Sequence, residues 1–214
     1  IPDSIPIKRC LLTANMETAI NAMWDTLPSC GDKILIIGSG IVGLLMAYIL
    51  RTIPGVEILL IDQDNQKKKM ANLFNITFKQ KIPKTYKANI IFECSGNSSV
   101  INSLSPHIMD EALICILSWY GNNISKVNFG EEFLSKRAKI IFSQVSKVSH
   151  NRSKYWDNAA RKKLAISLLN DDKLDSLIEK DMINFRDLPK FFSNVSKHKN
   201  FYCKVVNYGV KINV

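Results

Sequence analysis

Short apolar runs recur along the chain up to about residue 144, separated by polar and glycine-containing turns. Their residues are apolar at consecutive positions, which is typical of strands in a parallel sheet that is covered on both faces. The expected strands are residues 33–37, 57–61, 75–78, 89–93, 112–118 and 139–143. Helices are expected between them at residues 41–51, 65–74 and 98–109, the last ended early by Pro106. This alternation predicts an α/β fold of the doubly wound Rossmann type with a parallel six-stranded sheet.

Different patterns precede the first run and follow the last one. Residues 15–27 carry apolar side chains at helical spacing and predict an amphipathic helix. After about residue 144 the expected elements are helices at 155–170 and 188–196, an apolar piece at 174–185 and an edge strand at 201–208. We therefore expect a small α+β C-terminal extension, too small for a core of its own, that packs against another part of the protein.

Three glycines follow the first expected strand directly, in the spacing GxGxxG. The hexapeptide alone is a weak signal, but here it lies between a strand and a helix and precedes a second strand that ends in an acid. The first glycine permits the tight turn, the second lets a pyrophosphate approach the main chain, and the third lets the helix pack closely on the sheet. The helix start then favours phosphate through its N–H groups and its dipole. The residues expected to hold a dinucleotide here are Gly38, Ser39, Gly40, Ile41, Val42 and Gly43.

Asp62 ends the second strand 19 residues after the third glycine. A spacing of about 20 residues places an acid at the adenosine ribose of a bound dinucleotide. The Asp62 carboxylate would accept hydrogen bonds from the ribose diol and repel a 2′-phosphate, and Asp64 adds a second negative charge. These acids favour NAD over NADP. Gln63 and Lys67 belong to the same expected site, and the run of three lysines that begins at Lys67 weakens the preference.

Two other interpretations of the glycine turn remain open. In one, the glycines merely allow a tight strand–helix turn and Asp62 caps the next helix. In the other, the turn belongs to a methyltransferase-like domain for S-adenosylmethionine, a fold that also combines a glycine-rich turn with an acid. A membrane span over residues 34–50 is not expected, because its 17 residues are interrupted early by Gly38 and Gly40. A helix that crosses a bilayer needs about 20 residues.

The composition narrows the class of protein further. The net charge is +10, but the lysines are dispersed apart from one run and no nucleic-acid motif is present, so we expect no nucleic-acid partner. The five cysteines are odd in number and lack metal-ligand spacing, which favours free thiols in a cytoplasmic protein. The three histidines lie far apart, and His107 is expected on the surface. No residue stands out as a general acid or base, and no metal site is predicted.

Several motifs together resemble those of the zinc-type medium-chain alcohol dehydrogenase/reductase family. They are, in chain order, NMETAINAMWDTLPSCGDKILIIGSGIVGLLMAYIL, IDQD, IIFECSGN, ICILSWYG, LSKRAKIIFS, LDSLIEKDMINFRDLPKFFSNV and FYCKVVNY. The resemblance covers nearly the whole chain. It implies that residues 30–144 form an NAD-binding domain. Residues 1–29 would be a connecting segment and helix from a catalytic domain, and residues 145–214 would be the segment that returns to it.

The resemblance also implies further cofactor contacts at the carboxyl ends of the strands, where open α/β sheets bind their ligands. The residues after the fourth strand that would face a ribose are Ser95, Gly96 and Asn97. Those that end the fifth strand and would lie beside the nicotinamide are Ser118 and Trp119. The residue that ends the sixth strand and would lie near the carboxamide is Ser143. Glu17 and Thr18, at the start of the first helix, would flank the nicotinamide ring.

The sequence departs from that family in one respect, because the N-terminal catalytic domain with most of the zinc ligands is absent from it. The place of one further zinc ligand is taken by LTANM at residues 12–16, none of which is a good ligand, and zinc dependence is therefore doubtful. We expect an NAD-binding portion of an oxidoreductase that transfers hydride between nicotinamide and a small-molecule alcohol or carbonyl substrate, slow or inactive by itself. The alternative is a non-catalytic NAD-binding sensor module. A homodimer through the edge of the fifth and sixth strands is implied by the resemblance alone.

Overall fold

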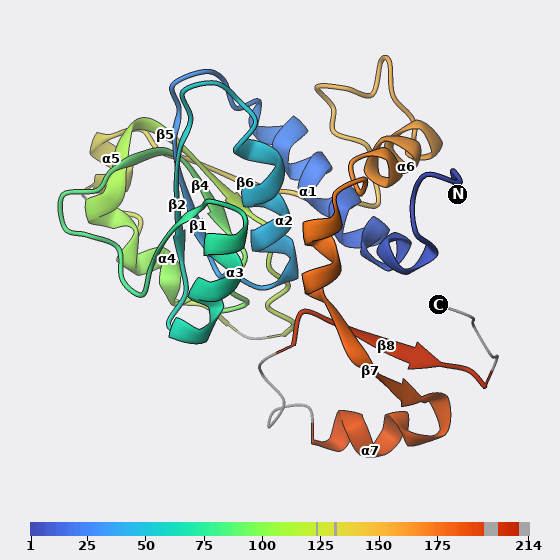
Figure 1. Ribbon diagram of the computed structural model, residues 1–214. Coiled ribbons are helices and arrows are strands. Elements are labelled where there is room, and N and C mark those ends of the chain that lie inside the picture. The colour runs from blue at the N-terminus through green and yellow to red at the C-terminus, as the bar shows by residue number, and fades with distance from the viewer. Residues whose placement is uncertain (123, 131, 195–200, 210–214) are drawn as a thin grey trace.

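The computed structural model describes residues 1–122, 124–130, 132–194 and 201–209. Its centre is a parallel six-stranded sheet with the strand order β3-β2-β1-β4-β5-β6 (Figure 1). The strands are β1 (Lys33–Ile37), β2 (Glu57–Ile61), β3 (Thr77–Lys79), β4 (Ala88–Glu93), β5 (Ile108–Ile116) and β6 (Lys139–Phe142). The order reverses between β1 and β4, which is the switch point of a doubly wound Rossmann sheet. The predicted fold class is confirmed.

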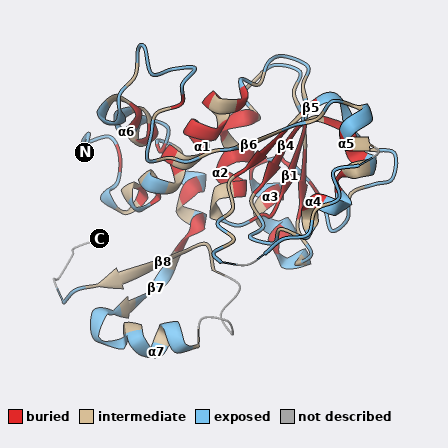
Figure 2. Cartoon of the chain, turned by 180° about the vertical axis from the view of Figure 1, so that it is seen from behind, coloured by how far each residue is buried: buried red, intermediate tan, exposed pale blue. Residues whose placement is uncertain are grey.

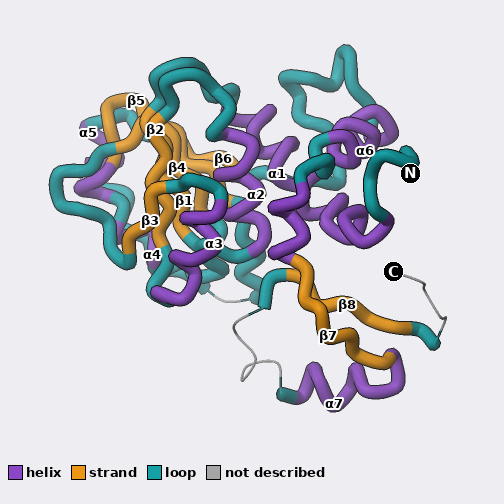
Figure 3. The backbone as a smooth tube through the Cα atoms, viewed as in Figure 1, coloured by secondary structure: helices purple, strands orange, loops and turns teal. Residues whose placement is uncertain are grey.

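Helices cover both faces of this sheet, as the ribbon and the tube show (Figures 1 and 3). The helices that contribute to the core on one face are α1 (Thr13–Thr26), α2 (Ile41–Leu50), α3 (Lys68–Leu73) and α6 (Asn158–Ser167). Those on the other face are α4 (Val100–Ser103) and α5 (Glu132–Ser135). The described 3₁₀ turns are η1 (Ile7–Leu12), η2 (Asn65–Lys67), η3 (Ser105–His107), η4 (Asp172–Leu177) and η5 (Phe185–Asp187).

Side chains of the central strands alternate between two apolar cores, one on each face of the sheet. In β1, Ile34 and Ile36 belong to the core beneath α1 and α2, whereas Leu35 and Ile37 belong to the opposite core. Figure 2 shows the buried residues concentrated in these strands and in the helices that cover them. The apolar runs are continuous because both faces of each strand exclude water.

The largest difference from the predicted elements lies between β4 and β5. The helix expected at residues 98–109 is only the single turn α4, followed by η3, and β5 already begins at Ile108. Pro106 lies in the first turn of η3, where its missing N–H is tolerated, and a continuous helix through it would lose a hydrogen bond. Nine residues of β5 therefore cross the sheet where seven were expected.

The C-terminal extension forms a small unit beside the main sheet. β7 (Ile178–Asn184) pairs in parallel with β8 (Cys203–Asn207), and α7 (Leu188–Ser193) lies between them in the chain. The unit is mostly exposed or half-buried (Figure 2). Leu174 and Leu177, just before it, are fully buried in the core beneath α1 and α2. The expected edge strand is thus present. Residues 195 and 196 of the expected helix lie outside the described residues.

Within the described part of the chain, no helix is both long enough and apolar enough to cross a membrane.

Candidate cofactor-binding site

The glycine turn lies at the switch point of the sheet, between the ends of β2 and β4. The N–H of Gly38 donates to the carbonyl of Ile61 at 2.8 Å, and its φ of +97° is one that residues with a side chain rarely adopt. A Cβ on Gly38 would lie 2.6 Å from the carbonyl oxygen of Cys94, and one on Gly43 would lie 1.9 Å from the carbonyl oxygen of Gly38. The first and third glycines are therefore required by the close approach of turn, helix and sheet.

Gly40 differs from its two neighbours, because a Cβ there would meet nothing within 4 Å. It is the N-cap of α2, and among the described residues no side chain caps this helix start. The first N–H groups of a helix have no partner within the helix, and the positive end of the helix dipole lies beside them. The start of α2 thus offers donors and free space at the point where the second glycine was expected to admit a pyrophosphate.

The carboxylate of Asp62 reaches back to this turn. Its Oδ2 accepts hydrogen bonds from the main-chain N–H of Ser39 at 2.9 Å and from the Ser39 hydroxyl at 3.1 Å. Its Oδ1 accepts from the N–H of Asp64 at 2.9 Å. The capping of the next turn falls to Asp64, which accepts from the N–H of Gln66 at 2.9 Å. The interpretation of Asp62 as a helix cap is therefore wrong.

The loops after β4 and β5 lie together, as the resemblance implied. Ser95, Gly96 and Asn97 are exposed, and the N–H of Gly96 donates to the Ser118 hydroxyl at 2.8 Å. Trp119 is 84% exposed beside them. The structure thus brings these predicted residues into one group at the carboxyl ends of the two strands.

Two predicted nicotinamide neighbours have other partners. The Ser143 hydroxyl donates to the carboxylate of Asp25 at 2.7 Å, on the last turn of α1. The carboxylate of Glu17 lies 3.4 Å from the Arg161 guanidinium, and both side chains are buried between α1 and α6. Glu17 therefore contributes to helix packing in this structure.

Lys67 is buried, and its ammonium lies 4.1 Å from the centre of the Tyr202 ring, within the range of a cation–π contact. Burial raises the pKa of Tyr202, and the nearby carboxylates of Asp62 and Asp64 raise it further. Tyr202 therefore lies at the end of the site where the adenosine ribose was expected. Gln63 is exposed, and its carbonyl accepts from the side-chain amide of Gln80 at 2.9 Å.

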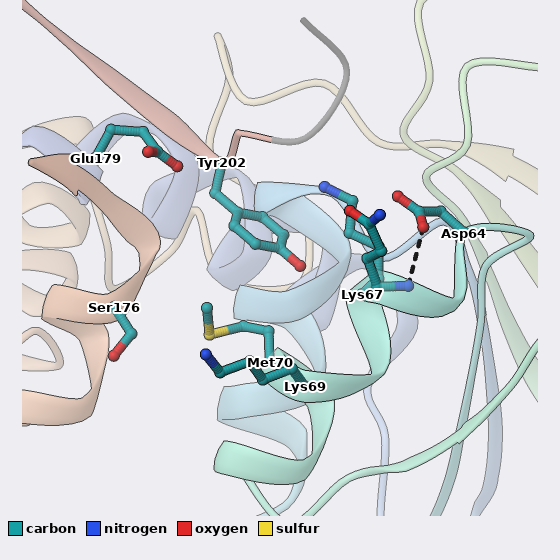
Figure 4. Close-up of a pocket in the computed structure, with 8 residues that line it drawn as sticks. Asp64, Lys67, Lys69, Met70, Ser176, Glu179 and Tyr202 are labelled. Carbon is teal, nitrogen blue, oxygen red and sulfur yellow. Dashed lines mark hydrogen bonds between the residues drawn. The ribbon is translucent and has the colours of Figure 1, made fainter. Parts of the chain in front are cut away.

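A pocket of about 300 Å³ opens beside this contact. Figure 4 shows Tyr202 and Glu179, from the C-terminal segment, facing Asp64 and Lys67 across it. The residues that line it come from η2, α3, η4 and β7, together with Asp64 and Tyr202, rather than from the glycine turn. The C-terminal segment thus forms one wall beside the second expected carboxylate, and no pattern in the sequence indicated this.

Two expectations from the sequence about individual side chains need correction. His107 was expected on the surface but is only 8% exposed, and its Nδ1 lies 2.9 Å from the carbonyl oxygen of Tyr86. Glu93 and Tyr120 were not among the predicted cofactor contacts, yet the hydrogen bond between them joins the loops after β4 and β5. The position of Glu93 at a strand end, and that of Tyr120 beside Trp119, could have indicated this. Burial raises the pKa of the Cys94 thiol well above its usual value, so this thiol stays protonated and unreactive.

The five cysteines, all of which the structure describes, are unpaired, as predicted. In the described ranges, histidine, cysteine and acidic side chains form no group of three that could hold a metal ion.

The fold is a doubly wound Rossmann sheet with a glycine turn at its switch point. No family model matches the chain. An uncharacterized zinc-type alcohol dehydrogenase-like protein from Haemophilus influenzae is 24% identical over 216 residues, which cover 96% of this chain and 59% of the relative.

Solved structures agree with this assignment of the fold. The chain superimposes on 2R,3R-butanediol dehydrogenase from Bacillus subtilis with a TM-score of 0.76 and 16% identity, over 97% of this chain and 59% of the other. The complex of S. aureus TarJ with NADPH gives a TM-score of 0.74 and 22% identity, over 97% and 66%. The curated relative from Haemophilus influenzae is also longer than this chain, which spans about three fifths of its length. The resemblance to zinc-type alcohol dehydrogenases is confirmed.

Proposed function

We propose that the chain is the cofactor-binding portion of a medium-chain alcohol dehydrogenase-like oxidoreductase, which transfers hydride between a nicotinamide dinucleotide and an alcohol or carbonyl substrate. Residues 30–144 would form the NAD-binding domain, and residues 1–29 and 145–214 would belong with a catalytic domain. The observation that carries the proposal is the open start of α2 at Gly40, directly at the switch point of the sheet. A dinucleotide supplies the hydride chemistry, and the chain binds and orients it.

The pyrophosphate would lie against Gly40 and the first turn of α2, which includes Ile41 and Val42. The free space at Gly40 admits phosphate oxygens to the main-chain N–H groups, whereas any side chain there would fill it. Gly38 and Gly43 would act indirectly, because they allow the turn and the helix to approach each other.

The adenosine ribose would lie at Asp62. A carboxylate has about four acceptor positions, and the hydrogen bonds from Ser39 and Asp64 occupy three of them. An acceptor position therefore remains for the ribose diol. The neighbouring carboxylate of Asp64 would repel a 2′-phosphate, and the ammonium of Lys67 is held against Tyr202. These charges support NAD over NADP, although the relative TarJ was solved with NADPH.

The nicotinamide half would extend toward the loops after β4 and β5. The group of Ser95, Gly96, Asn97, Ser118 and Trp119 would offer polar side chains and an exposed aromatic ring, while the N–H groups of Ser95, Gly96 and Asn97 donate within the two loops. Ser143 would approach the carboxamide only if its hydroxyl gave up the bond to Asp25.

Calorimetry with NAD, NADP and S-adenosylmethionine tests the proposal directly. We expect NAD to bind more tightly than NADP and S-adenosylmethionine to give no heat. Binding of S-adenosylmethionine alone, or no heat with either dinucleotide, would contradict the proposal. Assays of NADH formation with a panel of alcohols, on this chain and on a longer parent chain, then separate an oxidoreductase from a sensor. Activity in the longer chain supports the former, and NAD binding without activity in either supports the latter.

A further inference from the structure

Glu93 is the last residue of β4, and it is fully buried although it carries a carboxyl group. Its Oε1 accepts hydrogen bonds from the N–H of Ser95 at 2.7 Å and from the Ser95 hydroxyl. Its Oε2 accepts from the Tyr120 hydroxyl at 2.5 Å. Burial and the Glu93 carboxyl raise the pKa of Tyr120, so the phenol keeps its proton and remains the donor. Three hydrogen bonds offset the cost of removing the carboxyl group from water.

These bonds join two loops that are far apart in the sequence. We call residues 95–97 and 118–120 the β4–β5 wall. A second bridge in the wall is the hydrogen bond from the N–H of Gly96 to the Ser118 hydroxyl, at 2.8 Å. The wall also touches the glycine turn, because a Cβ on Gly38 would lie 2.8 Å from the Cα of Ser95. The β4–β5 wall therefore adjoins the glycine turn at the switch point.

The wall holds Trp119 in an exposed position. Its two neighbours in the chain, Ser118 and Tyr120, are bonded to Gly96 and Glu93, whereas the Trp119 side chain is 84% exposed. The other two tryptophans pack on each other, with ring centroids 5.0 Å apart. An indole that is presented to solvent by a fixed main chain suits stacking with a flat heteroaromatic ring.

We propose that Glu93 is a positioning residue, which preorganises the β4–β5 wall through Tyr120 and Ser95 to receive the nicotinamide half of a dinucleotide. This inference rests on the proposed function. Without the bonds to Glu93, the loop that carries Trp119 would have to be ordered when the cofactor binds, and ordering reduces affinity. The adenosine half would lie at Asp62, at the end of β2, and its affinity should therefore not depend on Glu93.

Tyr120→Phe tests the inference, because it keeps the ring and removes only the hydroxyl. In the proposed arrangement NAD would contact the wall and AMP would not, so calorimetry with both ligands separates positioning from a general loss of stability. We expect Tyr120→Phe to bind NAD about tenfold more weakly than the wild type, which corresponds to the loss of about one charge-assisted hydrogen bond. Its affinity for AMP should stay within about twofold of that of the wild type. Tyr86→Phe is the matched control. It removes a hydroxyl that donates to the carbonyl of Ile34 at 3.0 Å, near the opposite end of β1, and should leave both affinities unchanged.

Glu93→Gln provides an independent variant, because an amide nitrogen in place of one carboxyl oxygen cannot accept that oxygen's hydrogen bond from Ser95 or Tyr120, and Glu93 is not among the residues proposed to contact the cofactor. It should also weaken NAD selectively, and it keeps the test decisive if Tyr120→Phe does not fold. Equal losses for NAD and AMP, or unchanged NAD affinity in folded Tyr120→Phe, would overturn the role of Glu93 while the proposed function stands. If the wild type bound neither NAD nor AMP, the proposed function would fail and the inference with it.

Discussion

The carboxylate of Asp62, at the end of β2, accepts two hydrogen bonds from Ser39 inside the glycine turn, at 2.9 and 3.1 Å. The residue expected to bind the ribose therefore also fixes the turn expected to bind the pyrophosphate. Ser39 is fully buried, so these bonds are shielded from water. A change at Asp62 consequently acts on both halves of the proposed adenosine site.

Asp62→Ala should weaken NAD by about tenfold or more, because one hydrogen bond to a charged group typically contributes about 1.5–3 kcal/mol. NADP should lose less, since the substitution also relieves repulsion of the 2′-phosphate. Calorimetry with both cofactors measures the difference. Asp110→Ala is the control, because Asp110 is exposed near the start of β5, at the opposite end of the strands from the proposed site, and should leave both affinities unchanged. If Asp62→Ala lost the same affinity for NAD as for NADP, Asp62 would not be the hydrogen-bond partner of the ribose diol.

Gly40→Ala and Gly43→Ala should separate binding from stability. A Cβ at position 40 meets nothing within 4 Å, and the φ of Gly40 is −67°, so Gly40→Ala should unfold at the wild-type temperature but bind NAD at least about tenfold more weakly. A Cβ at position 43 would lie 1.9 Å from the carbonyl oxygen of Gly38, so Gly43→Ala should lose both stability and binding. Thermal unfolding and calorimetry check the pair. If Gly40→Ala bound NAD as tightly as the wild type, the pyrophosphate could not lie against Gly40.

Arg161→Met should destabilise the protein strongly. The Arg161 guanidinium is buried and binds the carboxylate of Glu17 and the side-chain oxygen of Asn21, which joins α6 to α1. Its loss leaves a buried acid without its cation, a change that typically costs about 3–5 kcal/mol. Denaturant unfolding measures this free energy. The exposed Arg137, paired with Glu111 at the surface, gives the control variant Arg137→Met, which should be close to wild type. Similar stabilities for the two variants would contradict the prediction.

The buried thiol of Cys115 should make the folded state less stable at high pH. Burial raises the pKa of its thiol from 9.0 to about 12. The folded state therefore holds a proton that the unfolded state releases above about pH 9. Stability is fully present below that pH and is lost as the pH rises toward 12, by about 3 kcal/mol at pH 11. Cys115→Ala should reduce this loss in unfolding measurements between pH 8 and about 11, whereas Cys30→Ala, which alters an exposed thiol, should not.

Much of the fold follows from local patterns in the sequence. The strand 33–37, the glycine turn and the strand 57–61 have strong signals, because continuous apolar runs and glycine spacing depend on neighbours in the chain. The predicted helix at 98–109 was wrong over most of its length. The apolar residues Ile101 and Leu104 suit a helix, but Pro106 and the pairing of β5 with β4 require extended chain from Ile108.

The sequence by itself determined the parallel sheet, the turn at residues 38–43 and the acid 19 residues beyond it, since each depends on residue types at short spacing. Only the tertiary structure decided which side chains meet. Glu93 and Tyr120 are 27 positions apart, and Lys67 and Tyr202 are further apart still, yet each pair lies in contact. Contacts of this kind arise when parallel strands bring their carboxyl ends to one edge and a distant segment packs beside them. The spacing of residues along the sequence does not reveal which of them will meet in this way.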